Sequence, residues 1–339
     1  MRPCGLWLGA ALALAPLGAA ASACAPEIDP VLGLAFDSRY AAEDASASTL
    51  IEAREEAAEA ALEPLDSFIR DLARDLDAML ETPADEPVAR ATAAACLLTA
   101  MADWAKADAL AHLETQTVRL TIGSRLAAFA IIANAAAAEL DQAADLEVVQ
   151  GWLAARVDEQ MVFWETAPDR AGQNNLRAWA ALAAAETARL TGDAVMRGWS
   201  AWSASYVLCS AAPDGSLPQE MTRGRLALHY QLHALAPLVT TVASLDQQGL
   251  PIRDRCDGAL GRAVQFALSD LENGAATQAI TGEVQSFFDG TDTIEPFQLA
   301  WLEAWLVLEP DAELAAVIEP MRPLRYSKLG GNQTALWAQ

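Results

Sequence analysis

Apolar residues recur at helical spacing along nearly the whole chain. Six long segments carry them at positions i, i+3, i+4 and i+7, which places them on one face of a helix. Alanine is abundant, and it favours both helix formation and close approach of neighbouring helices. The pattern predicts helices over residues 50–80, 89–111, 146–164, 178–190, 194–212 and 258–271.

The breaks between these helices are short, and they fall at residues 82–86, 166–172, 213–218 and 247–251. Short connections indicate antiparallel helix pairs, and no Pro-, Gly- or Ser-rich linker divides the chain. Alternating strand patterns are nearly absent. We therefore expect a single all-α domain over residues 24–339. A solenoid of helical repeats is the structural alternative, but the chain shows no fixed period near about 34 or 40 residues.

The first 23 residues have the pattern of a secretory signal. Arg2 is followed by an apolar run rich in alanine and leucine, and residues 21–23 have the A-x-A form of a cleavage site. We expect export to the periplasm. A lipoprotein signal that ends at Cys24 is the alternative. No other apolar run reaches the roughly 18 residues that a membrane span requires.

Cysteine and charge limit the chemistry further. An exported chain with an even number of cysteines after its signal is expected to form disulfides, and four cysteines allow three pairings. No CxxC motif occurs, and the three histidines form no set of metal ligands, so we expect neither a metal nor a cofactor. The cysteines are Cys24, Cys96, Cys209 and Cys256, and the histidines are His112, His229 and His233.

Removal of Arg2 leaves 21 Lys and Arg against 46 Asp and Glu, a net charge of about −25. Nucleic acid is an improbable partner, because its binding requires a basic face. An anionic polymer is compatible only if cations gather in a groove, where distant surface acids are screened over about 8 Å.

The segment 214–235, DGSLPQEMTRGRLALHYQLHAL, carries the candidate chemistry. Arg223 and Tyr230 are seven residues apart, so on one helix they would project from the same face, two turns apart. The guanidinium can hold a carboxylate, and its charge should lower the pKa of the tyrosine. Such a tyrosine can take a proton from carbon and return one to a leaving oxygen. A second segment, 173–181 (QNNLRAWAA), places Asn175 where a loop enters a helix.

Both segments resemble those of the alginate lyases of polysaccharide lyase family 5, whose patterns read roughly NNHSYWAA and GFLPNELxRxxRALxYHxxAL. Ser38-Arg39-Tyr40 is similar to the S-[KR]-Y of the family's lid loop. Further matches follow in the family's order at residues 257–260, 281–283, 300–303 and 329–331. The resemblance covers nearly the whole mature chain.

The resemblance implies an α/α toroid that cleaves a β-linked polyuronate by β-elimination, with polymannuronate as the expected substrate and glucuronan as the alternative. It implies that Asn175 and Arg223 neutralise the substrate carboxylate and that Tyr230 is base and then acid. It implies no cofactor, and we expect a monomer. Family cysteines near Cys24 and Cys96 favour the pairs Cys24–Cys96 and Cys209–Cys256. The residues expected to bind the polymer are Arg39, Tyr40, Arg119, Trp179, His229 and Lys328.

Several positions depart from the family pattern. Leu176 stands where the family has histidine, Gln231 replaces another histidine, and Leu120 replaces a tryptophan. These changes leave a mechanism in which the tyrosine acts alone. A non-catalytic exported protein that binds an anionic polysaccharide is the alternative, and Leu176 is the feature that favours it.

Each candidate also has an ordinary structural explanation. Tyr230 fits a core position with its hydroxyl satisfied, and Asn175 fits a helix cap. Trp179 lies at a helical position that is more often core than a sugar platform. The remaining basic candidates fit surface charges.

Overall fold

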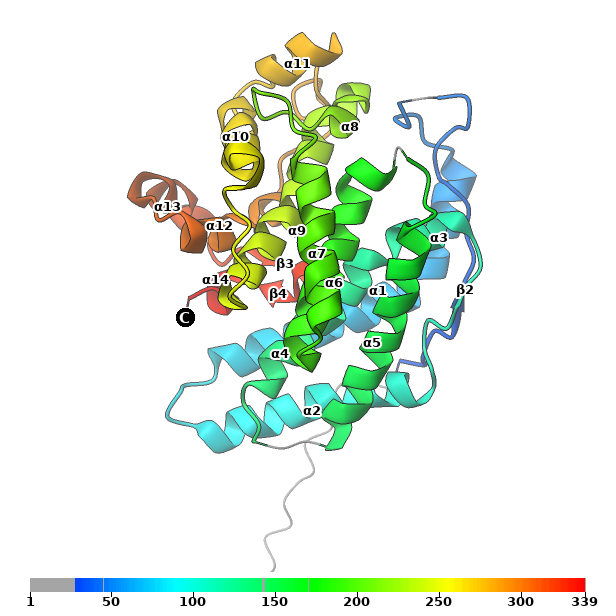
Figure 1. Cartoon of the computed structure of the whole chain (residues 1–339), viewed down its shortest axis with the longest axis vertical. Helices are drawn as coiled ribbons and strands as arrows, with labels where there is room; N and C mark the ends of the chain where they lie inside the picture. The colour runs from blue at the N-terminus through cyan, green and yellow to red at the C-terminus, as the bar shows by residue number, and fades with distance from the viewer. Residues whose placement is uncertain (1–27, 45, 142–143, 170, 339) are drawn as a thin grey trace, which may run out of the picture.

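Helices form most of the chain, as the hydrophobic pattern predicts (Figure 1). The computed structural model describes residues 28–44, 46–141, 144–169 and 171–338. The predicted signal segment and Cys24 lie outside these ranges. The long helices are α1 (Glu52–Glu81), α2 (Pro87–Lys106), α4 (Gly123–Ala137), α5 (Ala144–Trp164), α6 (Asn175–Thr191), α7 (Ala194–Leu208), α9 (Ala227–Gln247) and α10 (Arg255–Asp270).

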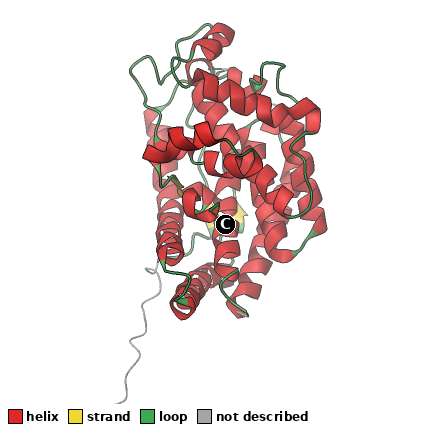
Figure 2. Ribbon diagram, turned by 90° about the vertical axis from the view of Figure 1, so that its left-hand side faces the viewer, coloured by secondary structure: helices red, strands yellow, loops and turns green. Residues whose placement is uncertain are grey.

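Short elements connect these helices. The strands occupy only small patches (Figure 2): β1 (Gly33–Leu34) pairs in parallel with β2 (His112–Leu113), and β3 (Arg325–Tyr326) pairs antiparallel with β4 (Gly331–Asn332). The short helices are α3 (Gln116–Thr121), α8 (Pro218–Met221), α11 (Ala275–Thr281), α12 (Leu302–Leu308), α13 (Ala312–Ile318) and α14 (Gln333–Leu336).

The helices form an inner and an outer layer. The inner helices α4, α6 and α9 pack side by side and are buried over most of their length. Outside them, α5 and α7 pack on α6, while α10 packs on α9. Gly123 allows α4 to approach α6 closely, because a Cβ there would lie 2.8 Å from the backbone nitrogen of Ala180. This layering places the start of α6 and the start of α9 in the same part of the molecule (Figure 1).

Differences from the expected helices have local causes. The six predicted segments do not include α4, because this helix is buried on nearly all sides and therefore shows no amphipathic period. Helix α2 ends five residues before the predicted end at residue 111, and Asp108 and Leu110 beyond it adopt left-handed backbone angles (φ 55° and 61°). The prediction overestimated α7 as well, since it ends at Leu208 rather than at residue 212.

A disulfide between Cys209 and Cys256 joins the end of α7 to the start of α10, with 5.2 Å between the two Cα atoms. This pair was expected and is confirmed. Cys24 lies outside the described residues, so the pair Cys24–Cys96 stays a prediction. Within the described ranges, no helix is long and apolar enough to cross a membrane.

Candidate active site

Tyr230 and Arg223 are in contact, but not in the way that the sequence suggested. The guanidinium carbon of Arg223 lies 3.6 Å from the centroid of the Tyr230 ring. Helix α9 begins only at Ala227, so the two residues do not share a continuous helix. The chain bends between them at Gly224, whose φ is 55° and whose added Cβ would meet the Glu283 carboxylate at 2.7 Å. The bend folds Arg223 back over the ring.

Two buried glutamines hold this bend in place. Gln231 accepts from the backbone nitrogen of Leu217 at 3.0 Å and donates to the Gly215 carbonyl at 3.2 Å. Gln285 accepts from the Leu228 nitrogen at 2.9 Å and donates to the Gly224 carbonyl at 3.2 Å. The residue that replaces a family histidine, Gln231, therefore fastens the turn before α8 to the first turns of α9.

Tyr40 joins Tyr230 and Arg223 in what we call the tyrosine cluster. Its hydroxyl forms a short hydrogen bond with the hydroxyl of Tyr230. The guanidinium carbons of Arg39 and Arg223 lie 5.4 and 4.9 Å from the centroid of the Tyr40 ring. The segment that carries the predicted lid motif is thus docked over Tyr230, and two arginines flank the pair of phenols.

The two phenols have opposite pKa shifts. Burial raises the pKa of Tyr230 to about 12, although the charge of Arg223 opposes this. Burial also raises the pKa of Tyr40, but the charges of Arg39 and Arg223 and the bond from Tyr230 outweigh it, and the net shift is downward. The expected lowering of the Tyr230 pKa is therefore wrong for this closed arrangement. Tyr40 is therefore the more acidic phenol of the pair, and Tyr230 holds its proton more tightly.

The lid segment also accepts hydrogen bonds from the Arg223 guanidinium. The guanidinium donates from Nε to the Ser46 carbonyl at 2.8 Å and from Nη2 to the Ala47 carbonyl at 2.5 Å. The carboxylate of Asp44 shapes this loop by accepting from the backbone nitrogens of Ser46 and Ser48, each at 2.9 Å. A guanidinium has five N–H donors, and the two carbonyls of this described loop do not use them all.

Asn175 is held by a residue that the sequence reasoning missed. The Glu220 carboxylate accepts from the Asn175 backbone nitrogen at 2.7 Å and from its Nδ2 at 3.2 and 3.1 Å. Burial raises the pKa of Glu220 to about 7, while the Asn175 bonds and the charge of Arg223 oppose the shift. The cap of α6 is Asn174, whose side chain accepts from the Leu176 nitrogen, so Asn175 is free of the capping role. Asn175, Glu220, Arg223 and Tyr230 form one connected group.

The two histidines flank Tyr230 from α9. Their ring centroids lie 5.2 Å (His229) and 6.1 Å (His233) from that of Tyr230. Trp179 Nε1 donates to His233 Nε2 at 3.1 Å, so the proton of the neutral imidazole sits on Nδ1. Burial lowers the pKa of His233 well below its usual value. His229 Nδ1 lies 3.4 Å from the Asp292 carboxylate, yet burial lowers its pKa as well. Both rings are therefore neutral near pH 7.

Of the remaining predicted binding residues, some lie near the tyrosines and one does not. Trp179 is only 2% exposed, so little of its ring can contact a sugar, and it reaches the site through His233. Lys328 is half-buried, and burial lowers its pKa to about 8, helped by the charge of Arg125. Arg119 is exposed on α3 and donates to the Leu113 carbonyl at 2.8 Å. Within the part of the chain that the structure describes, no contact joins Arg119 to the tyrosine cluster.

Cations therefore gather around the tyrosines, as an anionic ligand would require. The charges of Lys328, Arg39 and Arg223 all lower the pKa of His233, which places the three near one ring. Arg39 also lies 3.6 Å from the Glu55 carboxylate, and its side chain is 46% exposed. Among the described residues, no group of three or more His, Cys, Asp or Glu side chains is arranged to hold a metal ion.

Comparison with known proteins identifies the family to which the chain belongs. The family described as alginate lyase matches residues 35–277. The alginate lyase of Pseudomonas syringae pv. tomato is 27% identical over 316 residues, which cover 90% of this chain and 80% of that protein. The alginate lyase of Pseudomonas aeruginosa is 25% identical over 331 residues, covering 94% and 86%.

Solved structures show the same fold. Alginate lyase A1-III from Sphingomonas species A1 superposes with a TM-score of 0.74 at 22% identity, covering 93% of this chain and 86% of that one. A variant of A1-III in complex with a tetrasaccharide gives a TM-score of 0.78, with coverages of 93% and 85%. The likeness confirms the expected α/α toroid.

Proposed function

Because this chain belongs to the alginate lyase family, and is therefore a polysaccharide lyase, we propose that it cleaves β-1,4-linked polymannuronate by β-elimination with Tyr230 as base and acid. The observation that carries this proposal is the packing of the Arg223 guanidinium against the Tyr230 ring, at 3.6 Å from its centroid. One side chain that binds a carboxylate lies against another that can move a proton.

The first task of the site is to neutralise the substrate carboxylate. The C5 proton of a uronate is only weakly acidic while the adjacent carboxylate keeps its charge, so hydrogen bonds to that carboxylate lower the barrier. Among the described residues, the Ser46 and Ala47 carbonyls accept from two Arg223 nitrogens, which leaves further guanidinium N–H groups for the substrate. Asn175 Nδ2 lies 3.2 and 3.1 Å from the two Glu220 oxygens, and its hydrogen that is not directed at Glu220 can bind the same carboxylate. Ionised Glu220 accepts only from the nitrogen of the Asn175 amide, and this bond sets the orientation of that amide at the substrate. Glu220 is therefore a positioning residue.

The second task is to create a phenolate at Tyr230. Its own pKa of about 12 makes direct ionisation unfavourable, but its hydroxyl is hydrogen-bonded to that of Tyr40, whose pKa lies below the usual value. Transfer of the Tyr230 proton to an ionised Tyr40 leaves the negative charge beside Arg223. The Tyr230 phenolate then removes the C5 proton.

Elimination completes the reaction without water. The electron pair of the C5–H bond forms a C4=C5 double bond, and the C4–O bond breaks. In β-D-mannuronate the C5 hydrogen and the C4 oxygen lie on the same side of the ring. Tyr230 therefore returns the same proton to the leaving oxygen, and the site is restored.

A periplasmic location is part of the proposal. The support comes from the signal pattern of the first 23 residues and from the Cys209–Cys256 disulfide, because disulfides persist in oxidising compartments.

The test is the ultraviolet absorbance of the new double bond, followed on polymannuronate, glucuronan and mixed alginate. Wild type should cleave polymannuronate, and Tyr230→Phe should lose at least about a hundredfold in kcat while keeping its melting temperature. Activity retained in Tyr230→Phe would refute the role of this tyrosine. A wild type that binds polyuronate but produces no double bond would refute the enzyme and leave a binding protein.

A further inference from the structure

Arg177 is a buried cation outside the tyrosine cluster. It lies on α6, two residues after Asn175, and two residues correspond to about 200° around a helix, so it faces away from the catalytic group and toward α7. Arg177 is 5% exposed, and its one hydrogen bond within the described residues runs from Nε to Ser203 Oγ at 3.3 Å. No carboxylate among those residues pairs with it. An unpaired buried charge is costly and calls for an explanation.

Four aromatic rings surround this guanidinium. Its carbon lies 4.4 Å from the ring centroid of Trp202, 5.1 Å from that of Tyr206, 5.8 Å from that of Trp199 and 5.9 Å from that of Trp164. The ring faces stabilise the positive charge. Apart from Ser203 Oγ, no acceptor among the described residues takes the N–H donors at the edge of the guanidinium. A planar carboxylate is the group that such donors bind best.

Two of the four rings are open to solvent. Trp202 is 53% exposed and Tyr206 is 41% exposed. They are four residues apart on α7, with ring centroids 5.8 Å apart and planes inclined by 21°. Together they present a nearly flat apolar surface next to the Arg177 charge. A pyranose ring has an apolar C–H face that suits such a surface, and a uronate adds a carboxylate at its edge.

We propose that Arg177, Trp202 and Tyr206 form a second, non-catalytic binding site for a uronate unit of the polymer. The inference rests on the proposed function for the substrate class. Net charge supports the choice of ligand. The chain carries −24, so an acidic polymer is repelled by most of the surface and is attracted where a cation lacks an acid partner. A second contact on the same polymer raises its apparent affinity through effective concentration.

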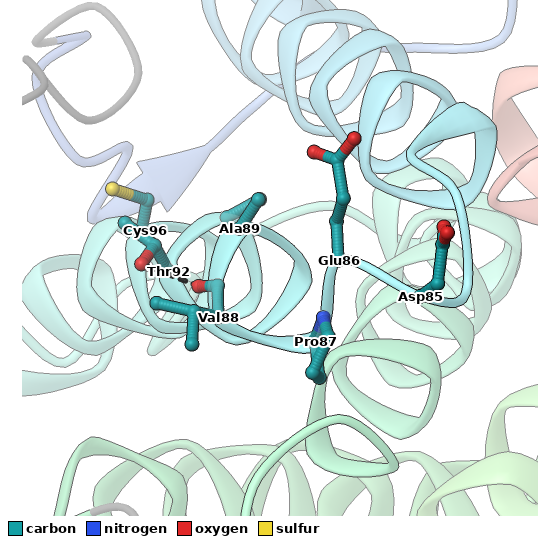
Figure 3. A pocket seen from close by; sticks show the side chains of 8 residues that line it. Asp85, Glu86, Pro87, Val88, Ala89, Thr92 and Cys96 are labelled. Carbon is teal, nitrogen blue, oxygen red and sulfur yellow. Dashed lines mark hydrogen bonds between the residues drawn. The ribbon is translucent and has the colours of Figure 1, made fainter.

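A surface hollow at the start of α2 is a poorer candidate for the same ligand (Figure 3). It lies where the chain enters α2, and its lining includes the carboxyl groups of Asp85 and Glu86 beside Val88 and Ala89. No Lys, Arg or His is among its lining residues. The two carboxylates of this hollow repel an anionic sugar, whereas the positive charge of Arg177 attracts one.

The test compares the double variant Trp202→Ala/Tyr206→Ala with Val317→Ala, which removes an exposed apolar side chain (66% exposed) on α13. Both are made with Tyr230→Phe, so that polymer is not cut, and run through native gels that contain polymannuronate or a neutral β-1,4-glucan. Loss of the two rings should weaken retardation by polymannuronate about fivefold, and Val317→Ala should not change it. Arg177→Gln should abolish the preference for the acidic polymer over the neutral one.

Kinetics separate this site from the catalytic one. With Tyr230 intact, the double variant should show about a fivefold higher KM on long polymannuronate and an unchanged kcat/KM on an oligomer short enough to occupy the catalytic site alone. Unchanged retardation together with a lower melting temperature would show that the rings only shield Arg177, and would overturn the proposal. The two proposals can also fail separately. If the wild-type protein cleaves no polyuronate but its retardation still depends on the two rings, the second site is supported and the proposed function is refuted.

Discussion

Replacing Glu220 by glutamine should stabilise the protein above neutral pH. In the folded state the pKa of this buried carboxyl is about 7, against an ordinary value of 4.5. The folded protein therefore holds a proton that the unfolded chain has released, so stability is lost as the pH rises from about 4.5 through about 7. The gap between the two values corresponds to about 3 kcal/mol at pH 8. Glutamine carries no charge and avoids this cost.

The same substitution should impair catalysis. Glutamine places an NH2 group where one carboxylate oxygen accepts from Asn175 Nδ2, at 3.1 Å, and two donors repel each other. The Asn175 amide is then expected to turn over and present its oxygen to the substrate carboxylate. The loss of one donor at a developing negative charge reduces kcat by about a hundredfold. Protonation of Glu220 in the wild type has the same effect, so wild-type activity should fall below about pH 7. That acidic limb should be absent from the variant.

Glu186→Gln is the matched control. Glu186 is also buried, burial raises its pKa, and it accepts from Asn134 Nδ2 at 3.0 Å on the inner helices. Its replacement should improve stability at pH 8 without a change in activity. Urea denaturation at pH 5 and pH 8, together with pH–rate profiles, measures both variants. A Glu220→Gln protein that is less stable than wild type at pH 8 would show that the Asn175 bonds outweigh burial, and would refute the reasoning.

Further predictions address the phenol pair, the lid and the disulfides. Tyr40→Phe should move the ascending limb of the pH–rate profile to higher pH, because Tyr230 loses its proton acceptor; an unchanged limb would exclude the relay. Arg39→Ala should raise KM more than it lowers kcat, whereas a fall in kcat alone would count against a lid that clamps substrate. Mass mapping of the unreduced protein should find both predicted disulfides, and four free thiols would contradict the periplasmic assignment. Loss of the Cys209–Cys256 bridge, which spans 47 residues, should cost about 4 kcal/mol of stability, measured as a lower denaturation midpoint.

Periodicity was sufficient for the amphipathic helices and failed where burial is uniform. Helices such as α1 and α5 bury one face and expose the other, and their predicted ends are close to those observed. Helix α4 faces protein on all sides, so its sequence lacks the alternation that marks a helix. The end of α2 is followed by residues with left-handed backbone angles, and the hydrophobic pattern of the sequence does not change there.

For the candidate site, the sequence predicted which residues lie together better than it predicted their pKa shifts. Arg223 and Tyr230 were correctly paired, although a bend at Gly224 brings them together instead of a shared helix face. The direction of the Tyr230 pKa shift was wrong, because burial depends on the whole fold and outweighs one nearby charge. Glu220 was missed because its partner Asn175 lies 45 residues earlier in the chain. Its place in the motif, three residues before Arg223, was the available signal.

The docked lid and the substrate carboxylate need not compete for Arg223. The lid takes two of the five N–H donors through the Ser46 and Ala47 carbonyls, which are neutral acceptors. A carboxylate on the other edge of the guanidinium is a charged acceptor and forms the stronger bonds. Each partner fixes the guanidinium plane for the other, so lid docking and substrate binding should favour each other. An acidic protein can thereby hold an acidic polymer where Arg39, Arg223 and Lys328 gather, while the negative surface around these cations repels the polymer.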